Sequence, residues 1–132
     1  YQIALNIGYN PATKIPDISR TYKIIDSQQQ DKYWKPQNYE KNTLGLITLR
    51  EALIHSRNLA TINLASLVGL DTIINGLYKF GFNKVPENMS IVLGSFGITP
   101  LKIAEEYTLF SNYGSKVKPR FVLELENKRK NL

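Results

Sequence analysis

Apolar residues recur at helical spacing along most of this 132-residue chain. Four segments combine that period with start or stop signals for a helix, and they are residues 48–56, 58–68, 71–81 and 99–114. A shorter apolar segment, residues 3–7, reads as the end of a helix because Gly8 and then Asn10-Pro11 follow it. The pattern therefore predicts a mainly helical protein.

Extended chain is predicted at few places. Residues 22–25 are a candidate short strand, and residues 120–126 alternate apolar with polar positions as an amphipathic strand does. Residues 15–17 read as irregular or extended chain, and the polar, glutamine-rich residues 26–42 form the longest predicted loop. Trp34 lies in that loop, where it either lines a groove or pins the loop onto the domain.

A serine and an asparagine two residues apart mark the junction between the first two long helices. Thr48 and Glu51 form a capping box, which fixes the phase of the helix that they begin. In that phase Ser56 lies on the apolar, inward-facing stripe, seven residues after Leu49. Asn58 lies on the apolar face of the next helix. Because residues two apart point to nearly opposite sides of one straight helix, we predict a break or bend between Ser56 and Asn58 that turns both toward one site.

Both residues also have an ordinary structural interpretation. A buried serine commonly donates a hydrogen bond to the carbonyl four residues earlier, and an asparagine near a helix junction commonly caps a helix. The sequence around Ser56 and Asn58 favours a functional interpretation.

Several further segments, in a fixed order and spacing, form a recognisable series. They are Trp34-Lys35-Pro36-Gln37-Asn38-Tyr39, Gly45-Leu46-Ile47-Thr48-Leu49-Arg50-Glu51-Ala52-Leu53, Ser56-Arg57-Asn58, Val68-Gly69-Leu70-Asp71, Leu93-Gly94-Ser95, Thr99-Pro100-Leu101, Tyr107, Gly114 and Pro119. Taken together, the chain from Ile3 to Phe121 resembles the transpeptidase domain of class A penicillin-binding proteins, bacterial enzymes that cross-link peptidoglycan. Of that family's three motifs, S-x-x-K, S-x-N and K-[ST]-G, only the second is expected here, as Ser56-Arg57-Asn58.

The resemblance implies a fold class and a domain. It implies an α+β, predominantly helical chain, the helical portion of a penicillin-binding-protein or β-lactamase-like transpeptidase domain, with at most the first strand of its sheet. Residues 1–132 would be a partial transpeptidase domain that lacks the S-x-x-K and K-[ST]-G segments. Ser115-Lys116-Val117-Lys118 spells S-x-x-K, but it lies between the helix-end signal at Gly114 and Pro119. We expect a loop there, which does not hold a lysine one helical turn after a serine.

The resemblance also implies a reaction. A serine outside this chain would attack a D-alanyl-D-alanine peptide, expel the terminal D-alanine and pass the acyl group to an amine. Ser56 would relay a proton to the leaving group, and Asn58 would bind the acylating peptide or a β-lactam. Arg57 is expected to point away from the site. The expected partners are peptidoglycan stem peptides and β-lactams, with no cofactor and no metal, and the chain alone is expected to be inactive.

Composition narrows the function classes without naming one. The chain has no cysteine and a single histidine, His55, so thiolate and histidine metal sites are not expected. Its net charge of +6 comes from basic residues spread along the chain, which does not indicate nucleic-acid binding. No apolar run approaches the roughly 20 residues that span a membrane. By resemblance, membrane attachment would use a segment outside this chain, at the periplasmic face of the bacterial inner membrane.

Two other classes of function stay open at this point. One is a non-catalytic module of the same ancestry that binds peptidoglycan or a partner without turnover. The other is a helical interaction domain unrelated to cell walls, which would show a contiguous basic face and strongly salt-dependent binding.

Overall fold

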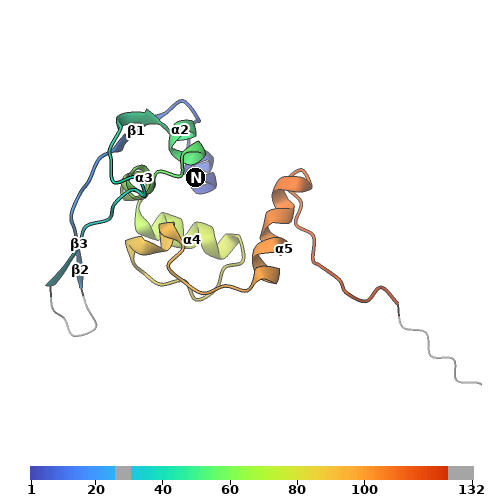
Figure 1. The fold of residues 1–132 in the computed structure, drawn as a ribbon. Helices are drawn as coiled ribbons and strands as arrows, with labels where there is room; N and C mark the ends of the chain where they lie inside the picture. Colours follow the sequence, from blue (N-terminus) through green and yellow to red (C-terminus); the bar gives the residue numbers. More distant parts are fainter. Residues whose placement is uncertain (26–30, 125–132) are drawn as a thin grey trace, which may run out of the picture. The chain divides into compact units, whose positions relative to one another are not determined.

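The computed structural model describes residues 1–25 and 31–124, and they divide into two compact units (Figure 1). The first unit runs from Tyr1 to Phe96, and the second begins at Gly97. The helices and strands of the first unit are α1 (Gln2–Asn6), β1 (Lys14–Asp17), β2 (Tyr22–Ile25), β3 (Asp31–Trp34), β4 (Gly45–Thr48), α2 (Leu49–Ile54), α3 (Asn58–Val68), α4 (Leu70–Lys79) and the 3-10 helix η1 (Met89–Leu93). The second unit contains α5 (Pro100–Ser111). The predominantly helical α+β class is thus confirmed.

The strands form two small antiparallel sheets. Strand β1 pairs with β4, with Ile15 opposite Ile47, and β2 pairs with β3, with Tyr22 opposite Trp34. The strand predicted over residues 22–25 is confirmed. The sequence did not predict β3 and β4, because each has only four residues and forms through pairing with a partner strand. Part of the predicted loop 26–42 is therefore β3, and residues 26–30 lie outside the described chain.

Helix α2 begins as its capping box predicts. The Glu51 N–H donates to Thr48 Oγ1 at 3.1 Å, and Glu51 Oε2 accepts from the Thr48 N–H at 2.7 Å. Since Thr48 is also the last residue of β4, the cap turns the chain directly from the strand into the helix. Strand β1 and helix α2 therefore share one buried cluster that includes Ile15, Leu49 and Ala52.

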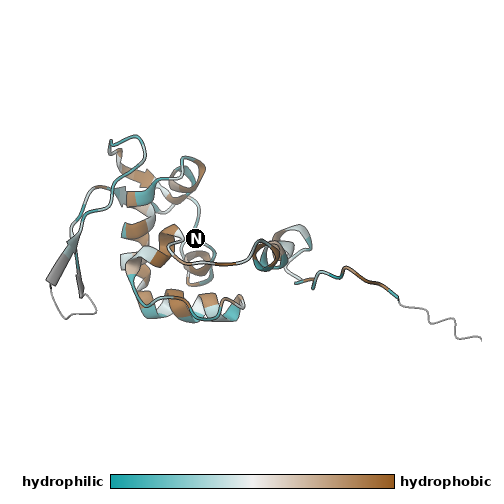
Figure 2. Ribbon diagram, turned by 60° about the horizontal axis from the view of Figure 1, so that its bottom comes forward, coloured by the Kyte–Doolittle hydropathy of each residue, from teal (hydrophilic) through white to brown (hydrophobic). Residues whose placement is uncertain are grey.

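Helix α3 lies at the centre of the first unit. One side of it joins the cluster with β1, β4 and α2 through Ala60 and Leu64. Its last turn joins a second cluster, in which Ala65 packs with residues of α4 and η1. Figure 2 shows that apolar residues along these helices are interleaved with polar ones. Burial of apolar surface on two sides of α3 stabilises this helix and so fixes the position of its first residue, Asn58.

Helix α4 follows α3 after the single residue Gly69. Its backbone φ of +89° lies in the region that glycine adopts without strain. Helix α4 begins one residue before the predicted start at residue 71, so Asp71 lies in the first turn and is not the N-cap. Among the residues described, no single helix is long and apolar enough to cross a membrane. Helices α3 and α4 reach that length and composition only together, with a bend of 96° between them.

The second unit is built on α5. The Lys102 N–H donates to Thr99 Oγ1 at 3.3 Å and Pro100 occupies the first turn, so the predicted N-terminus is confirmed. The strand predicted over residues 120–126 is wrong for residues 120–124, which are irregular, with Phe121 86% exposed. An alternating pattern becomes a strand only beside a partner strand, and the described part of this unit contains none. Residues 125 and 126 lie outside the described chain.

Candidate active site

The predicted break between Ser56 and Asn58 is present. Helix α2 ends at Ile54, and α3 begins at Asn58. The Ser56 N–H donates to the Leu53 carbonyl at 3.1 Å, and the Arg57 N–H donates to the Ala52 carbonyl at 2.9 Å. These two bonds form a Schellman motif, whose left-handed residue is usually glycine. Here that residue is Ser56, with a φ of +48°.

Ser56 is exposed, so the expectation that it faces inward is wrong. The buried stripe of α2 stops at Leu49 and Ala52, and Leu53 is already 58% exposed. The left-handed turn then carries the Ser56 side chain away from the course that a continued helix would give it. Ser56 Oγ also forms no hydrogen bond to the residues described, whereas Ser66 Oγ donates to the Ile62 carbonyl at 3.1 Å. Ser56 therefore does not have the ordinary back-bonding role of a helical serine.

Ser56 and Asn58 line one groove, as predicted. The groove has a volume of about 260 Å³, and its other lining residues are Tyr1, Ala52, Leu53, Thr61, Val92 and Leu93. Asn58 Nδ2 donates to the Gln37 backbone carbonyl at 3.2 Å, which leaves the side-chain oxygen Oδ1 of Asn58 available as an acceptor. The break thus places one hydroxyl and one carboxamide at the same groove.

Arg57 points away from that groove, as expected, into a buried network. Its side chain is 4% exposed, and that of Asp17, on β1, is fully buried. Arg57 Nη2 lies 2.6 Å from Asp17 Oδ2, and Nε lies 3.0 Å from the same oxygen. The guanidinium also donates to the Asn42 carbonyl and to Glu40. Because Arg57 lies between Ser56 and Asn58, this network fixes the junction from its inner side.

Asn38 completes the network and caps the N-terminus of α3 from outside the helix. Helix α3 has no side-chain cap of its own, and the Leu59 N–H donates to Asn38 Oδ1 at 3.0 Å. Asn38 Nδ2 donates to Asp17 Oδ1 at 2.9 Å. Burial alone would raise the pKa of Asp17, but hydrogen bonds from Arg57, Asn38 and the Leu44 N–H outweigh it and hold that pKa below its ordinary value.

Sequence reasoning missed Asp17 and Asn38 as parts of the site. Each is a single polar residue in an irregular or extended stretch, and the sequence separation of 40 between Asp17 and Arg57 leaves no spacing signal. Trp34 lies on β3 with its ring centroid 5.7 Å from that of Tyr22, so within the described chain it packs on the β2–β3 hairpin.

The S-x-x-K spelling at residues 115–118 lies in irregular chain after α5, as expected. Lys116 Nζ binds Glu106 Oε1 at 2.5 Å, and Lys102 Nζ binds the same oxygen at 2.8 Å. This arrangement provides no helical turn that would hold a lysine beside Ser115. In the described ranges, no group of three acidic, histidine or cysteine side chains could hold a metal ion.

Comparisons with known proteins show the family of this chain. The family model of the penicillin binding protein transpeptidase domain matches residues 13–131. Penicillin-binding protein 1A of Pseudomonas aeruginosa is 35% identical over 130 residues, which cover 97% of this chain and 16% of that protein. Penicillin-binding protein 1A of Rickettsia conorii is 43% identical over 90 residues, which cover 67% of this chain and 11% of that protein.

A solved structure gives the same result for the fold. The crystal structure of penicillin-binding protein 1A from Haemophilus influenzae matches with a TM-score of 0.73 and 29% identity, over 85% of this chain and 16% of that one. The chain therefore spans 16% or less of the length of these relatives. On the family match and the relatives together, the chain belongs to the penicillin-binding protein transpeptidase domain family.

Proposed function

We propose that this chain forms part of the acyl-transfer site of a peptidoglycan D,D-transpeptidase. In this proposal a serine of an S-x-x-K segment outside residues 1–132 attacks the D-alanyl-D-alanine end of a stem peptide. Ser56 relays a proton to the leaving amine, and Asn58 holds the acylating peptide or a β-lactam. The enzyme acts at the periplasmic face of the bacterial inner membrane, to which it attaches through another segment.

The observation that carries the proposal is the conformation of Ser56. A serine in the left-handed region costs free energy relative to glycine, and such strain is concentrated at functional sites. The strain also has a consequence here, because the turn exposes Ser56 in the groove that Asn58 lines. Because Lys41, Lys84 and Tyr113 also have positive φ values, the turn supports the proposal through the place in the groove that it gives to Ser56.

Single substitutions in a protein that carries the whole transpeptidase domain test the two roles. With Ser56→Ala we expect acylation by a β-lactam to slow on the order of 10²-fold or more, as for loss of a positioned acid–base group. With Asn58→Ala we expect both a slower acylation and a higher half-saturating concentration, because a ligand contact is lost. Stopped-flow acylation over a range of β-lactam concentrations separates the two parameters.

Ser66→Ala and Asn75→Ala are matched controls. Both remove the same side-chain groups from exposed helical positions that do not line the groove. The controls should acylate like the parent protein. If Ser56→Ala and Asn58→Ala also acylate like the parent but melt at lower temperature, the two residues are structural and the proposed roles are wrong.

A further inference from the structure

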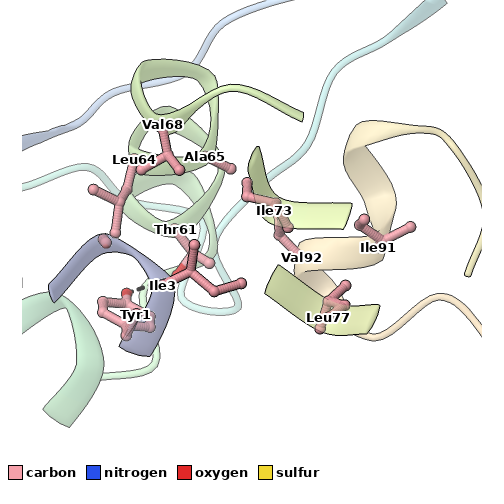
Figure 3. A pocket seen from close by; sticks show the side chains of 11 residues that line it. Tyr1, Ile3, Thr61, Leu64, Ala65, Val68, Ile73, Leu77, Ile91 and Val92 are labelled. Carbon is pink, nitrogen blue, oxygen red and sulfur yellow. Dashed lines mark hydrogen bonds between the residues drawn. The ribbon is translucent and has the colours of Figure 1, made fainter. Parts of the chain in front are cut away.

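A chain of hydroxyl groups connects the first residue of the structure to the backbone between Ser56 and Asn58. Tyr1 Oη lies 2.8 Å from Thr61 Oγ1, as Figure 3 shows by its dashed line. Thr61 Oγ1 in turn donates to the Arg57 carbonyl at 2.9 Å. That carbonyl belongs to the peptide group joining Arg57 to Asn58, so the chain of bonds ends on the junction itself.

The direction of each bond follows from counting protons. A threonine hydroxyl has one proton, and Thr61 gives it to the Arg57 carbonyl. The bond between Tyr1 and Thr61 must then be donated by Tyr1. Burial raises the pKa of Tyr1 and outweighs the opposite effect of its bond to Thr61, so the phenol keeps the proton that this bond requires. Bonds in such a chain polarise and strengthen one another.

The same two side chains form part of the wall of the groove. Tyr1 and Thr61 line the groove of Ser56 and Asn58, and they also line a neighbouring cavity of about 220 Å³ (Figure 3). The rest of that cavity is mainly apolar, with Ile3, Leu64 and Ile73 among its lining residues. The Tyr1 ring also packs against the buried cluster that contains Ala52 and Ala60, so packing places the ring and the hydrogen bonds orient its hydroxyl toward the junction.

We infer that Tyr1 and Thr61 are positioning residues, whose hydrogen-bond chain to the Arg57 carbonyl holds the Ser56–Asn58 junction in its working geometry. Arg57 is then fixed twice: its side chain by Asp17, and its carbonyl by the Thr61 hydroxyl together with the Thr61 backbone N–H, which donates at 3.1 Å. This inference rests on the proposed function of Ser56 and Asn58. It predicts that Tyr1 and Thr61 affect the acylation rate constant, because a small misplacement of a reacting group slows the reaction.

The test compares Tyr1→Phe and Thr61→Val in a protein with the whole transpeptidase domain. Each removes one hydroxyl and keeps nearly the same shape. We expect each to lower the β-lactam acylation rate constant roughly 10-fold, within the range that misplacement of a reacting group produces, with the half-saturating concentration unchanged. The double variant should be no slower than either single variant, because both break one chain. Thr61→Ser, which restores the hydroxyl, should recover most of the rate.

Tyr22→Phe is the matched control. Tyr22 also donates a hydrogen bond from its phenol to α3, at 3.1 Å to Asn63 Oδ1, but it does not line the groove. It should lower the melting temperature as much as Tyr1→Phe and leave the acylation rate unchanged. Equal melting losses in Tyr1→Phe, Thr61→Val and Tyr22→Phe with unchanged acylation rates would overturn the inference.

Failure of the inference and failure of the proposed function give different results. If Ser56→Ala acylates slowly while Tyr1→Phe and Thr61→Val acylate normally, only the positioning roles are wrong. If Ser56→Ala itself acylates normally, the proposed role of Ser56 is wrong, and the positioning inference is overturned with it.

Discussion

Ser56 combines a strained backbone, which lowers the stability of the fold, with an exposed hydroxyl, which the proposed reaction uses. A non-glycine residue in the left-handed region costs roughly 1–2 kcal/mol. The hydroxyl has no hydrogen bond to the described residues that would offset this cost. Stability and activity should therefore respond in opposite directions to substitutions at this one position.

Ser56→Gly tests that opposition directly. Glycine adopts a φ of +48° without strain, so we expect the free energy of unfolding to rise by roughly 1 kcal/mol, less the greater chain entropy of glycine in the unfolded state. Acylation should fall as it does for Ser56→Ala, because both lack the hydroxyl. Urea unfolding and stopped-flow acylation measure the two effects.

Ser56→Ala is the control for this prediction, since alanine keeps the strain. Its unfolding free energy should stay within a few tenths of a kcal/mol of the parent, as for exposed substitutions in general. A glycine variant less stable than the alanine variant would show that the left-handed turn is not strained.

At the residue scale, the sequence predicted that Ser56 and Asn58 meet at one site, but it did not predict the backbone turn and the buried network that bring them together. The two-residue separation of Ser56 and Asn58 was enough to require a break between helices. It did not predict the left-handed turn, because glycine is the usual signal for it and serine stands there. Asp17 and Asn38 are distant from Arg57 in the sequence, and the fold brings Asp17 to Arg57 and Asn38 to Asp17.

At the element scale, the Asp17–Arg57 pair joins β1 to the start of α3. Both side chains are almost completely removed from water, and removal of one partner would leave an uncompensated buried charge. The Asp17 carboxylate therefore adds to the apolar packing that holds α3, and its contribution makes the free energy of unfolding depend on pH.

Asp17→Asn should lower the free energy of unfolding by about 3 kcal/mol at pH 7, because Arg57 then lacks its buried counter-charge. The folded-state pKa of Asp17 is lowered, so its contribution is fully present above the ordinary carboxyl value of about 4. That contribution is lost as the pH falls through the lowered folded-state value. The difference in unfolding free energy between the parent and Asp17→Asn should therefore become smaller in acid. Urea unfolding at a series of pH values would measure it.

Glu40→Gln provides the comparison. Glu40 also binds Arg57, at 3.1 Å, but its side chain is 52% exposed. Its removal should cost no more than about 1 kcal/mol at any pH, as for other exposed ion pairs. If Asp17→Asn and Glu40→Gln cause equally small losses of unfolding free energy, and neither loss depends on pH, the buried pair does not hold the junction.

In the second unit, Lys116 should tie the chain after α5 back to that helix. It binds Glu106, whose side chain is 4% exposed, and the neighbouring Val117 N–H donates to Thr108 Oγ1 at 2.9 Å. Lys116→Met should leave Glu106 with Lys102 alone and speed hydrogen exchange at the Val117 amide several-fold, corresponding to a loss of about 1 kcal/mol.

Lys118→Met removes a lysine from the same segment for comparison. Lys118 is exposed and forms no ion pair with the residues described, so its replacement should leave the Val117 exchange rate unchanged. Equal acceleration in both variants would indicate a general charge effect and contradict the specific role of Lys116.

Helices were predicted better than strands because their signals are local. The capping box at Thr48 and the Thr99-Pro100 start fix helix ends within a few residues. Strands β3 and β4 contain only four residues each, and they exist through pairing with β2 and β1. The alternating pattern at residues 120–124 shows the converse, since without a partner strand the same kind of signal leaves irregular chain.

At the scale of the whole molecule, family membership follows from matches spread over nearly the whole chain, and no single motif carries it. Ser56-Arg57-Asn58 alone is three residues, and the left-handed turn and the shared groove are the observations that support its proposed function. The proposal also places the attacking serine outside this chain, so no serine within the chain should act as the nucleophile.

Ser115 begins the one S-x-x-K spelling in the sequence, so it is the residue on which this distinction is tested. The 132-residue chain, incubated with excess labelled penicillin, should gain no covalent adduct by intact mass. In a protein with the whole transpeptidase domain, Ser115→Ala should acylate at the parental rate. The physical reason is that residues 115–118 are irregular and Lys116 is held by Glu106, so no lysine is fixed where it could take the Ser115 proton. Stoichiometric labelling at Ser115 would show that this loop is the nucleophilic segment and that the proposed reaction has its serine in the wrong place.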